Sequence, residues 1–280
     1  MHGRRMGSLG RPERGQGGIV GRVADDGQVV PLHREEWLSS AGRPVRALVA
    51  GAAAPALPRI RIVPGLGAMG YMVDLLHACA AWTEAALLDL PGYGNPVTSD
   101  CAADLDTLTP VTAGCLGAPA EPPVLLVGHS TGAQLALRAA VRAPARVAGL
   151  VLIGITFDPP VRERWPRLVP RLRTYLHERP RELLVTVPDF VRGRSRVTQY
   201  LASALRDRPE DHVGQVRCPV LVLRGRRDAL SPLPWARDLA QRCVDGEART
   251  LPGSHNVTYT HPGAVALQIG ALARAVAPGR

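Results

Sequence analysis

The sequence predicts an α/β protein whose mostly parallel central sheet is covered by helices on both faces. Apolar segments of strand length recur along the chain, and turns rich in Gly or Pro end several of them. Segments of helical pattern follow some of these turns. Strands that are apolar throughout are typical of a parallel sheet buried on both sides. The 280 residues suffice for one such domain with a small insert.

The expected strands are short, and most are continuously apolar. We place them at Val45–Ala50, Arg59–Val63, Ala85–Leu90, Pro123–Val127, Val147–Ile155 and Pro219–Leu223. Helices are expected at Ala133–Val141, which is rich in Ala and Leu, and at Pro262–Val276, which is amphipathic. Ser99 or Asp100 could cap a further helix, because both residue types accept hydrogen bonds from the free N–H groups of a helix start.

Two segments depart from the alternation of strands and helices. Residues 1–18 are basic and Gly-rich, and we expect them to form a disordered leader. Residues 159–217 lie between two expected strands and look helical, with Pro and Arg punctuation. An insert there would lie over the carboxyl ends of the strands, where ligands bind in open α/β sheets. We therefore divide the chain into an α/β core, 19–158 and 218–280, and a helical cap, 159–217.

The formal net charge of +10 raises the question of a nucleic-acid or membrane partner. All 34 basic residues are Arg, and abundant Ala, Gly, Pro and Arg are typical of a chain encoded by GC-rich DNA. No nucleic-acid-binding motif is present, and no apolar stretch has the length of a bilayer span. We expect a cytoplasmic protein, monomeric or homodimeric, that binds neither nucleic acid nor membrane.

Residues 128–132 have the sequence Gly-His-Ser-Thr-Gly, directly after an expected strand and directly before an expected helix. Gly-x-Ser-x-Gly is a weak pattern by itself, but this setting is the one that a nucleophile elbow requires. The two glycines would remove side chains that collide with the neighbouring strand and helix. Ser130 is the predicted nucleophile, and the backbone N–H of Thr131 is a predicted oxyanion donor. His129 is expected to be structural.

A serine nucleophile needs a histidine base, which works best when a carboxylate orients it. Asp228 and His255 both follow strand-like segments, and both would lie at the sheet edge that carries Ser130. Asp228 lies among arginines, so a surface ion pair is the alternative to a catalytic role. Asp158 is the alternative acid, and His261 is the alternative base.

The second oxyanion donor is expected on the loop after an early strand, where residues 64–67 have the sequence Pro-Gly-Leu-Gly. The backbone N–H of Leu66 is the candidate, and a plain turn is the alternative. The five cysteines show neither disulfide nor zinc-site spacing. We expect no cofactor and no metal.

Four segments together resemble the α/β-hydrolase superfamily, in its capped branch of esterases, lactonases and carbon–carbon bond hydrolases. They are Pro64–Gly67, Asp89–Gly94, Gly128–Gly132, and Gly225–Asp228 with Ser254–His255. The resemblance implies the α/β-hydrolase fold, with nucleophile, acid and histidine in that chain order. Pro64 stands where the family usually has His. Asn256 follows His255 where carbon–carbon bond hydrolases often carry Trp, which argues against that chemistry.

The predicted function is that of a carboxylesterase-like serine hydrolase. It would act on an ester, thioester or lactone of a small molecule through a Ser-His-Asp triad and an acyl-enzyme. Two alternatives stay open: a non-hydrolytic or carbon–carbon bond-cleaving enzyme of secondary metabolism, and a non-catalytic small-molecule binder. The cap arginines could recognise an acidic group or simply form a solvated face; they are Arg162, Arg164, Arg167, Arg171 and Arg173.

Overall fold

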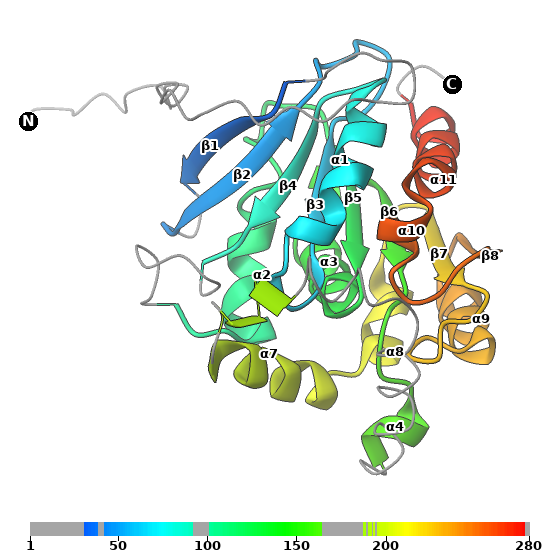
Figure 1. The fold of residues 1–280 in the computed structure, drawn as a ribbon. Helices are drawn as coiled ribbons and strands as arrows, with labels where there is room; N and C mark the ends of the chain where they lie inside the picture. The colour runs from blue at the N-terminus through cyan, green and yellow to red at the C-terminus, as the bar shows by residue number, and fades with distance from the viewer. Residues whose placement is uncertain are drawn as a thin grey trace, which may run out of the picture.

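An eight-stranded sheet forms the centre of the molecule, with the strand order β1-β2-β4-β3-β5-β6-β7-β8 (Figure 1). The computed structural model describes residues 31–38, 42–91, 101–163 and 195–277, together with 187, 188, 190, 191 and 193. Strand β2 runs antiparallel to β1 and to β4, and the other neighbouring pairs are parallel. The predicted α/β class with a mostly parallel sheet is confirmed.

The strands are β1 (His33–Leu38), β2 (Pro44–Ala50), β3 (Ile60–Val63), β4 (Ala85–Asp89), β5 (Val124–His129), β6 (Val147–Ile153), β7 (Val220–Gly225) and β8 (Gly246–Leu251). All six predicted strands are present, with ends within two residues of the prediction. Every residue of β3, β5 and β7 is buried, which explains why these strands are apolar apart from Arg61, His129 and Arg224. Strand β8 is mostly exposed at the sheet edge, so its polar sequence does not resemble a buried strand.

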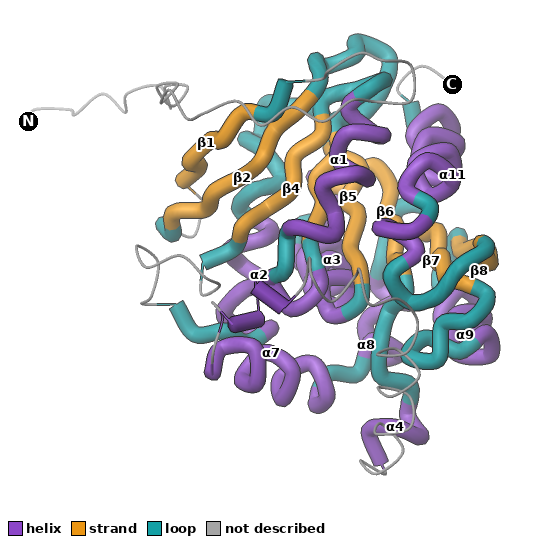
Figure 2. Tube along the Cα trace, in the orientation of Figure 1, coloured by secondary structure: helices purple, strands orange, loops and turns teal. Residues whose placement is uncertain are grey.

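Helices cover both faces of the sheet and create two apolar cores (Figure 2). One core contains side chains of α1 (Val73–Ala80), α10 (Val257–Thr260) and α11 (Pro262–Ala275). The other contains side chains of α2 (Leu105–Ala113), α3 (Thr131–Arg142) and α9 (Leu233–Arg242). Single 3₁₀ turns lie at Gly65–Gly67, Gly70–Met72, Pro144–Arg146 and Val213–Gln215. Both predicted helices are confirmed, as α3 and α11.

The cap of α2 differs from the prediction. The backbone N–H of Thr107 donates to Asp104 Oδ1 at 2.7 Å, so Asp104 is the N-cap. Ser99 and Asp100 lie outside the described residues, several positions before the helix begins. The correct residue type was expected at the wrong place, because Ser and Asp recur along this segment and the sequence alone does not show which of them precedes the first helical turn.

The segment predicted as a cap contributes α4 (Pro159–Glu163), α7 (Ser195–Arg206) and α8 (Pro209–His212) to the described structure. Helix α7 packs against α2, α3 and the 3₁₀ turn after β3 (Figure 1). Tyr200 Oη donates to the Thr131 carbonyl at 3.2 Å, and Gln134 Nε2 donates to the Ala204 carbonyl at 3.0 Å. Helix α7 is therefore anchored on helix α3, at the end that begins beside Ser130.

Parts of the predicted organisation lie outside the described residues. These parts are the leader 1–18, the end of the Asp89–Gly94 motif, and the cap arginines Arg164, Arg167, Arg171 and Arg173. The division into core and cap stays a prediction. Among the described helices, none has both the length and the apolar character of a membrane span.

Candidate active site

The turn between β5 and α3 holds Ser130 in a rare backbone conformation, with φ +57° and ψ −125°. Such a conformation costs on the order of 1–3 kcal/mol for a residue with a side chain and persists only where its surroundings enforce it. Here the Ser130 N–H donates to the Ile153 carbonyl at 2.8 Å, and the Ser130 carbonyl accepts from Ala133 N–H at 3.0 Å. The strand-to-helix elbow predicted from the sequence is present.

Both glycines of the elbow are required by close approach of backbone atoms. A Cβ at Gly128 would lie 2.4 Å from the carbonyl oxygen of Gly132. A Cβ at Gly132 would lie 2.5 Å from the carbonyl oxygens of Val63 and Pro64. No side chain fits at either position, so the predicted steric reason for Gly-x-Ser-x-Gly is confirmed.

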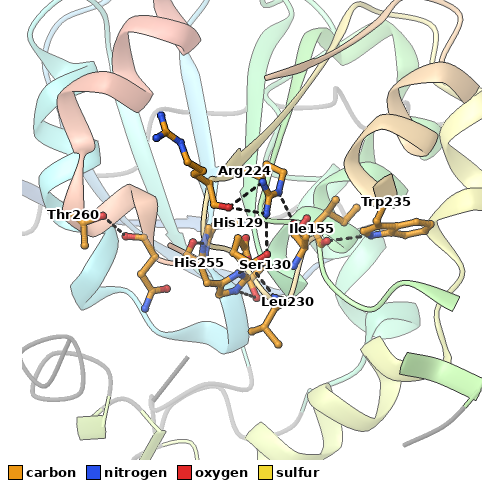
Figure 3. Close-up of polar contacts among 12 residues, drawn as sticks. His129, Ser130, Ile155, Arg224, Leu230, Trp235, His255 and Thr260 are labelled. Carbon is orange, nitrogen blue, oxygen red and sulfur yellow. Dashed lines mark hydrogen bonds and ion pairs between the residues drawn. The ribbon is translucent and has the colours of Figure 1, made fainter. Parts of the chain in front are cut away.

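Ser130, His255 and Asp228 lie in hydrogen-bond contact (Figure 3). Ser130 Oγ is 3.0 Å from His255 Nε2, and His255 Nδ1 is 3.0 Å from each carboxylate oxygen of Asp228. An ionised carboxylate only accepts hydrogen bonds, so Nδ1 carries the imidazole proton. Nε2 is then free to accept the Ser130 hydroxyl. The structure brings the three predicted residues together in the order that proton transfer from serine requires.

Asp228 is a buried acceptor with only 2 % of its surface exposed. Leu230 N–H and Ser231 N–H both donate to its Oδ1 at 2.9 Å. Burial alone would raise the pKa of Asp228, but the charge and hydrogen bond of His255, together with the Ser231 N–H, hold that pKa below its ordinary value. Asp228 therefore stays ionised, and the alternative of a surface ion pair is excluded.

Arg224 shapes the loop that carries Asp228, and sequence reasoning missed it. Its side chain is 6 % exposed, and its Nε donates to the Ser231 carbonyl at 2.7 Å. Its Nη2 donates to the Asp228 carbonyl at 2.9 Å, and both terminal nitrogens reach the Arg226 carbonyl at 3.4 Å (Figure 3). The only signal in the sequence is a charged residue at the end of an apolar strand.

The alternative acid and base have other places in the fold. His261 precedes α11 and shares a 2.9 Å hydrogen bond with Thr260 Oγ1. Asp158 follows β6, and its backbone carbonyl accepts from the N–H groups of Val161 and Arg162 in α4. The hydrogen bonds from His255 Nδ1 to both carboxylate oxygens of Asp228 identify Asp228 as its acid. Within the described part of the chain, no three His, Cys, Asp or Glu side chains gather as a metal site would require.

The two predicted oxyanion donors lie next to each other. The Leu66 N–H donates to Thr131 Oγ1 at 2.8 Å, and Leu66 itself has a left-handed φ of +46°. Thr131 is the first residue of α3, where backbone N–H groups have no partner inside the helix. In this structure the Thr131 hydroxyl therefore accepts the hydrogen bond of the Leu66 N–H.

Comparison with known proteins identifies the family of this chain. The sequence pattern of the alpha/beta hydrolase family matches residues 62–268. A pimeloyl-[acyl-carrier protein] methyl ester esterase of Nitrosomonas europaea is 30% identical over 205 residues, which are 63% of this chain and 76% of that protein. The enol-lactonase from Burkholderia xenovorans superposes with a TM-score of 0.69 at 17% identity, over 85% of this chain and 99% of its own. A thermophilic esterase from Thermogutta terrifontis superposes with a TM-score of 0.69 at 18% identity, over 87% of this chain and 99% of its own. This chain belongs to the alpha/beta hydrolase family.

Proposed function

We propose that the protein is a serine hydrolase that transfers the acyl group of a small-molecule ester, thioester or lactone to water. The observation that carries this proposal is the continuous hydrogen-bonded line from Ser130 Oγ through His255 to the buried carboxylate of Asp228. Two similar proteins are named as a methyl ester esterase and an enol-lactonase, and these names support hydrolysis of an ester or lactone bond. A carboxylesterase-like activity is the form that we expect.

The reaction follows from the orientation of the imidazole. His255 Nε2 takes the Ser130 proton as Oγ attacks the carbonyl carbon, and Asp228 stabilises the imidazolium that forms. The backbone N–H of Thr131, with the Leu66 N–H beside it, stabilises the negative charge on the carbonyl oxygen. His255 then returns the proton to the leaving oxygen or sulfur. Water, deprotonated by the same His255, releases the acid and restores Ser130.

A panel of p-nitrophenyl esters, acyl thioesters and lactones tests the proposal. Ser130→Ala should lower kcat by about a thousandfold or more, because no other group supplies the nucleophile. Ser195→Ala is the matched control, since Ser195 is exposed at the start of α7, and its kcat should equal that of the wild type. Hydrolysis retained in Ser130→Ala would refute the assignment of the nucleophile.

The same panel, extended by a substrate with a cleavable carbon–carbon bond, separates the alternatives. Release of a carboxylic acid and an alcohol, thiol or hydroxy acid is expected. Turnover of a carbon–carbon bond substrate without turnover of any ester, thioester or lactone would favour the carbon–carbon hydrolase. Binding without turnover of any substrate class would favour the non-catalytic binder.

A further inference from the structure

A second line of hydrogen bonds runs behind Ser130 and uses two side chains that the proposed mechanism does not involve. Gly65 N–H donates to Tyr71 Oη at 2.8 Å, and Tyr71 Oη lies 2.8 Å from His129 Nδ1. His129 Nε2 lies 3.0 Å from the backbone carbonyl oxygen of His255. The side chains of Tyr71 and His129 are 3 % and 1 % exposed, so water does not compete for these bonds.

The proton positions along this line follow from its two ends. A carbonyl oxygen only accepts, so His129 Nε2 must donate to the His255 carbonyl. Burial, with the charge of His255 acting in the same direction, lowers the pKa of His129 to about 3, so its ring is neutral near pH 7. Nδ1 of a neutral ring with a protonated Nε2 only accepts, so the Tyr71 hydroxyl donates to it. Each donor then faces an acceptor from Gly65 to His255.

The line joins the two loops that must meet at Ser130. Gly65 is the first residue of the 3₁₀ turn that contains the Leu66 donor. It lies so close to the elbow that a Cβ at this position would be 2.9 Å from Ser130 Cβ. At the other end, the bonded carbonyl is that of the proposed base itself. The His129 ring also packs against both partners, with ring centroids 5.2 Å from Tyr71 and 4.9 Å from His255.

We propose that Tyr71 and His129 are positioning residues, which hold the oxyanion loop and the backbone of His255 at fixed places relative to Ser130. This inference rests on the proposed function. Its physical basis is that misplacing a catalytic group by about 1 Å can cost as much as a hundredfold in rate. Both side chains are buried, so we expect them to act on the rate of the chemical step and not on substrate binding.

The first variant is Tyr71→Phe, which removes the hydroxyl. Gly65 N–H then loses its acceptor, and His129 Nδ1 loses its donor. We expect kcat for p-nitrophenyl butyrate to fall by roughly ten- to a hundredfold, with KM within about twofold of the wild type. The rate at which a fluorophosphonate probe labels Ser130 should fall by a similar factor. Tyr259→Phe is the control, since this partly buried tyrosine packs against the same apolar core, and it should leave both rates unchanged.

The second test varies the donor at residue 129, and it decides the question even where Tyr71→Phe does not fold. The side-chain amide of His129→Gln can donate to the His255 carbonyl, whereas His129→Leu cannot. We expect Gln to retain labelling within about fivefold and Leu to lose about a hundredfold, each measured per folded molecule. Equal labelling by Gln, Leu and wild type would overturn the inference. Labelling that persists in Ser130→Ala would instead refute the proposed function.

Discussion

Thr131 contributes two polar groups to the turn that holds Ser130, a backbone N–H at the start of α3 and a hydroxyl bonded to Leu66 N–H. The sequence predicted only the first, because the elbow motif places the residue after the nucleophile at a helix N-terminus. The hydroxyl contact could not be predicted. It joins residues 65 positions apart, and its geometry depends on the left-handed φ of Leu66.

Substitution of Thr131 tests this contact. Thr131→Val keeps the shape but removes the hydroxyl that accepts from the Leu66 N–H, so the loop that carries this donor loses its hydrogen bond to α3. We expect kcat for an ester substrate to fall by about a hundredfold, the usual effect of losing one oxyanion donor. Thr131→Ser keeps the hydroxyl and should stay within about threefold. A fully active Thr131→Val would show that neither Leu66 N–H nor the hydroxyl serves the reaction.

The loop after β7 shows how one buried charge organises a whole segment. Arg224 donates to the backbone carbonyls of Arg226, Asp228 and Ser231. These residues belong to the loop whose Asp228 carboxylate contacts His255. The same loop is tied to the base-bearing loop, because Arg227 N–H donates to the Gly253 carbonyl at 2.9 Å. The place of Asp228 after a strand was enough to predict it as the acid. The contacts of Arg224 could not be predicted, because its partners are backbone carbonyls whose positions depend on the fold.

The expected consequence of losing Arg224 is a less stable protein with a displaced acid. Arg224→Met should lower the free energy of unfolding by about 2–3 kcal/mol, because several buried carbonyls lose a charged donor. It should also lower kcat. Arg226→Met is the control, since Arg226 is exposed beside it, and should change stability by less than about 0.5 kcal/mol. Urea denaturation of both variants measures the difference, and equal stabilities would contradict the role given to Arg224.

The free energy of unfolding of the whole molecule depends on pH through His129. Its pKa is lowered to about 3 in the folded state, from an ordinary value of 6.5. Between these values the unfolded chain binds a proton at this residue that the folded protein does not, so acid favours unfolding. The contribution of His129 is therefore present above about pH 6.5 and is lost progressively as the pH falls toward 3.

This linkage predicts a measurable difference between wild type and His129→Gln. From about pH 7 to about pH 5, the wild type should lose roughly 2 kcal/mol more stability than the variant, whose amide does not titrate. Urea denaturation at the two pH values measures both losses. Parallel losses in the two proteins would show that His129 is not held neutral.

Across the whole chain, what could be predicted follows from burial. Strand β5 lies between two layers of helices, so its sequence is continuously apolar over Val124–Val127 and recognisable. Strand β8 lies exposed at the edge and gave no such signal. Ser130, Asp228 and His255 were recognised because each follows a strand end, while Tyr71, Tyr200 and Arg224 were missed because their partners are distant in sequence or are backbone carbonyls.

The proposed reaction depends most on the activation of Ser130 by His255 and Asp228. Mass spectrometry after treatment with a fluorophosphonate probe tests it directly, because the probe reacts with activated serines and remains attached to them. We expect one adduct per chain, on the peptide that contains Ser130, and loss of that adduct in His255→Ala. An adduct on another serine, or full labelling of Ser130 in His255→Ala, would contradict it.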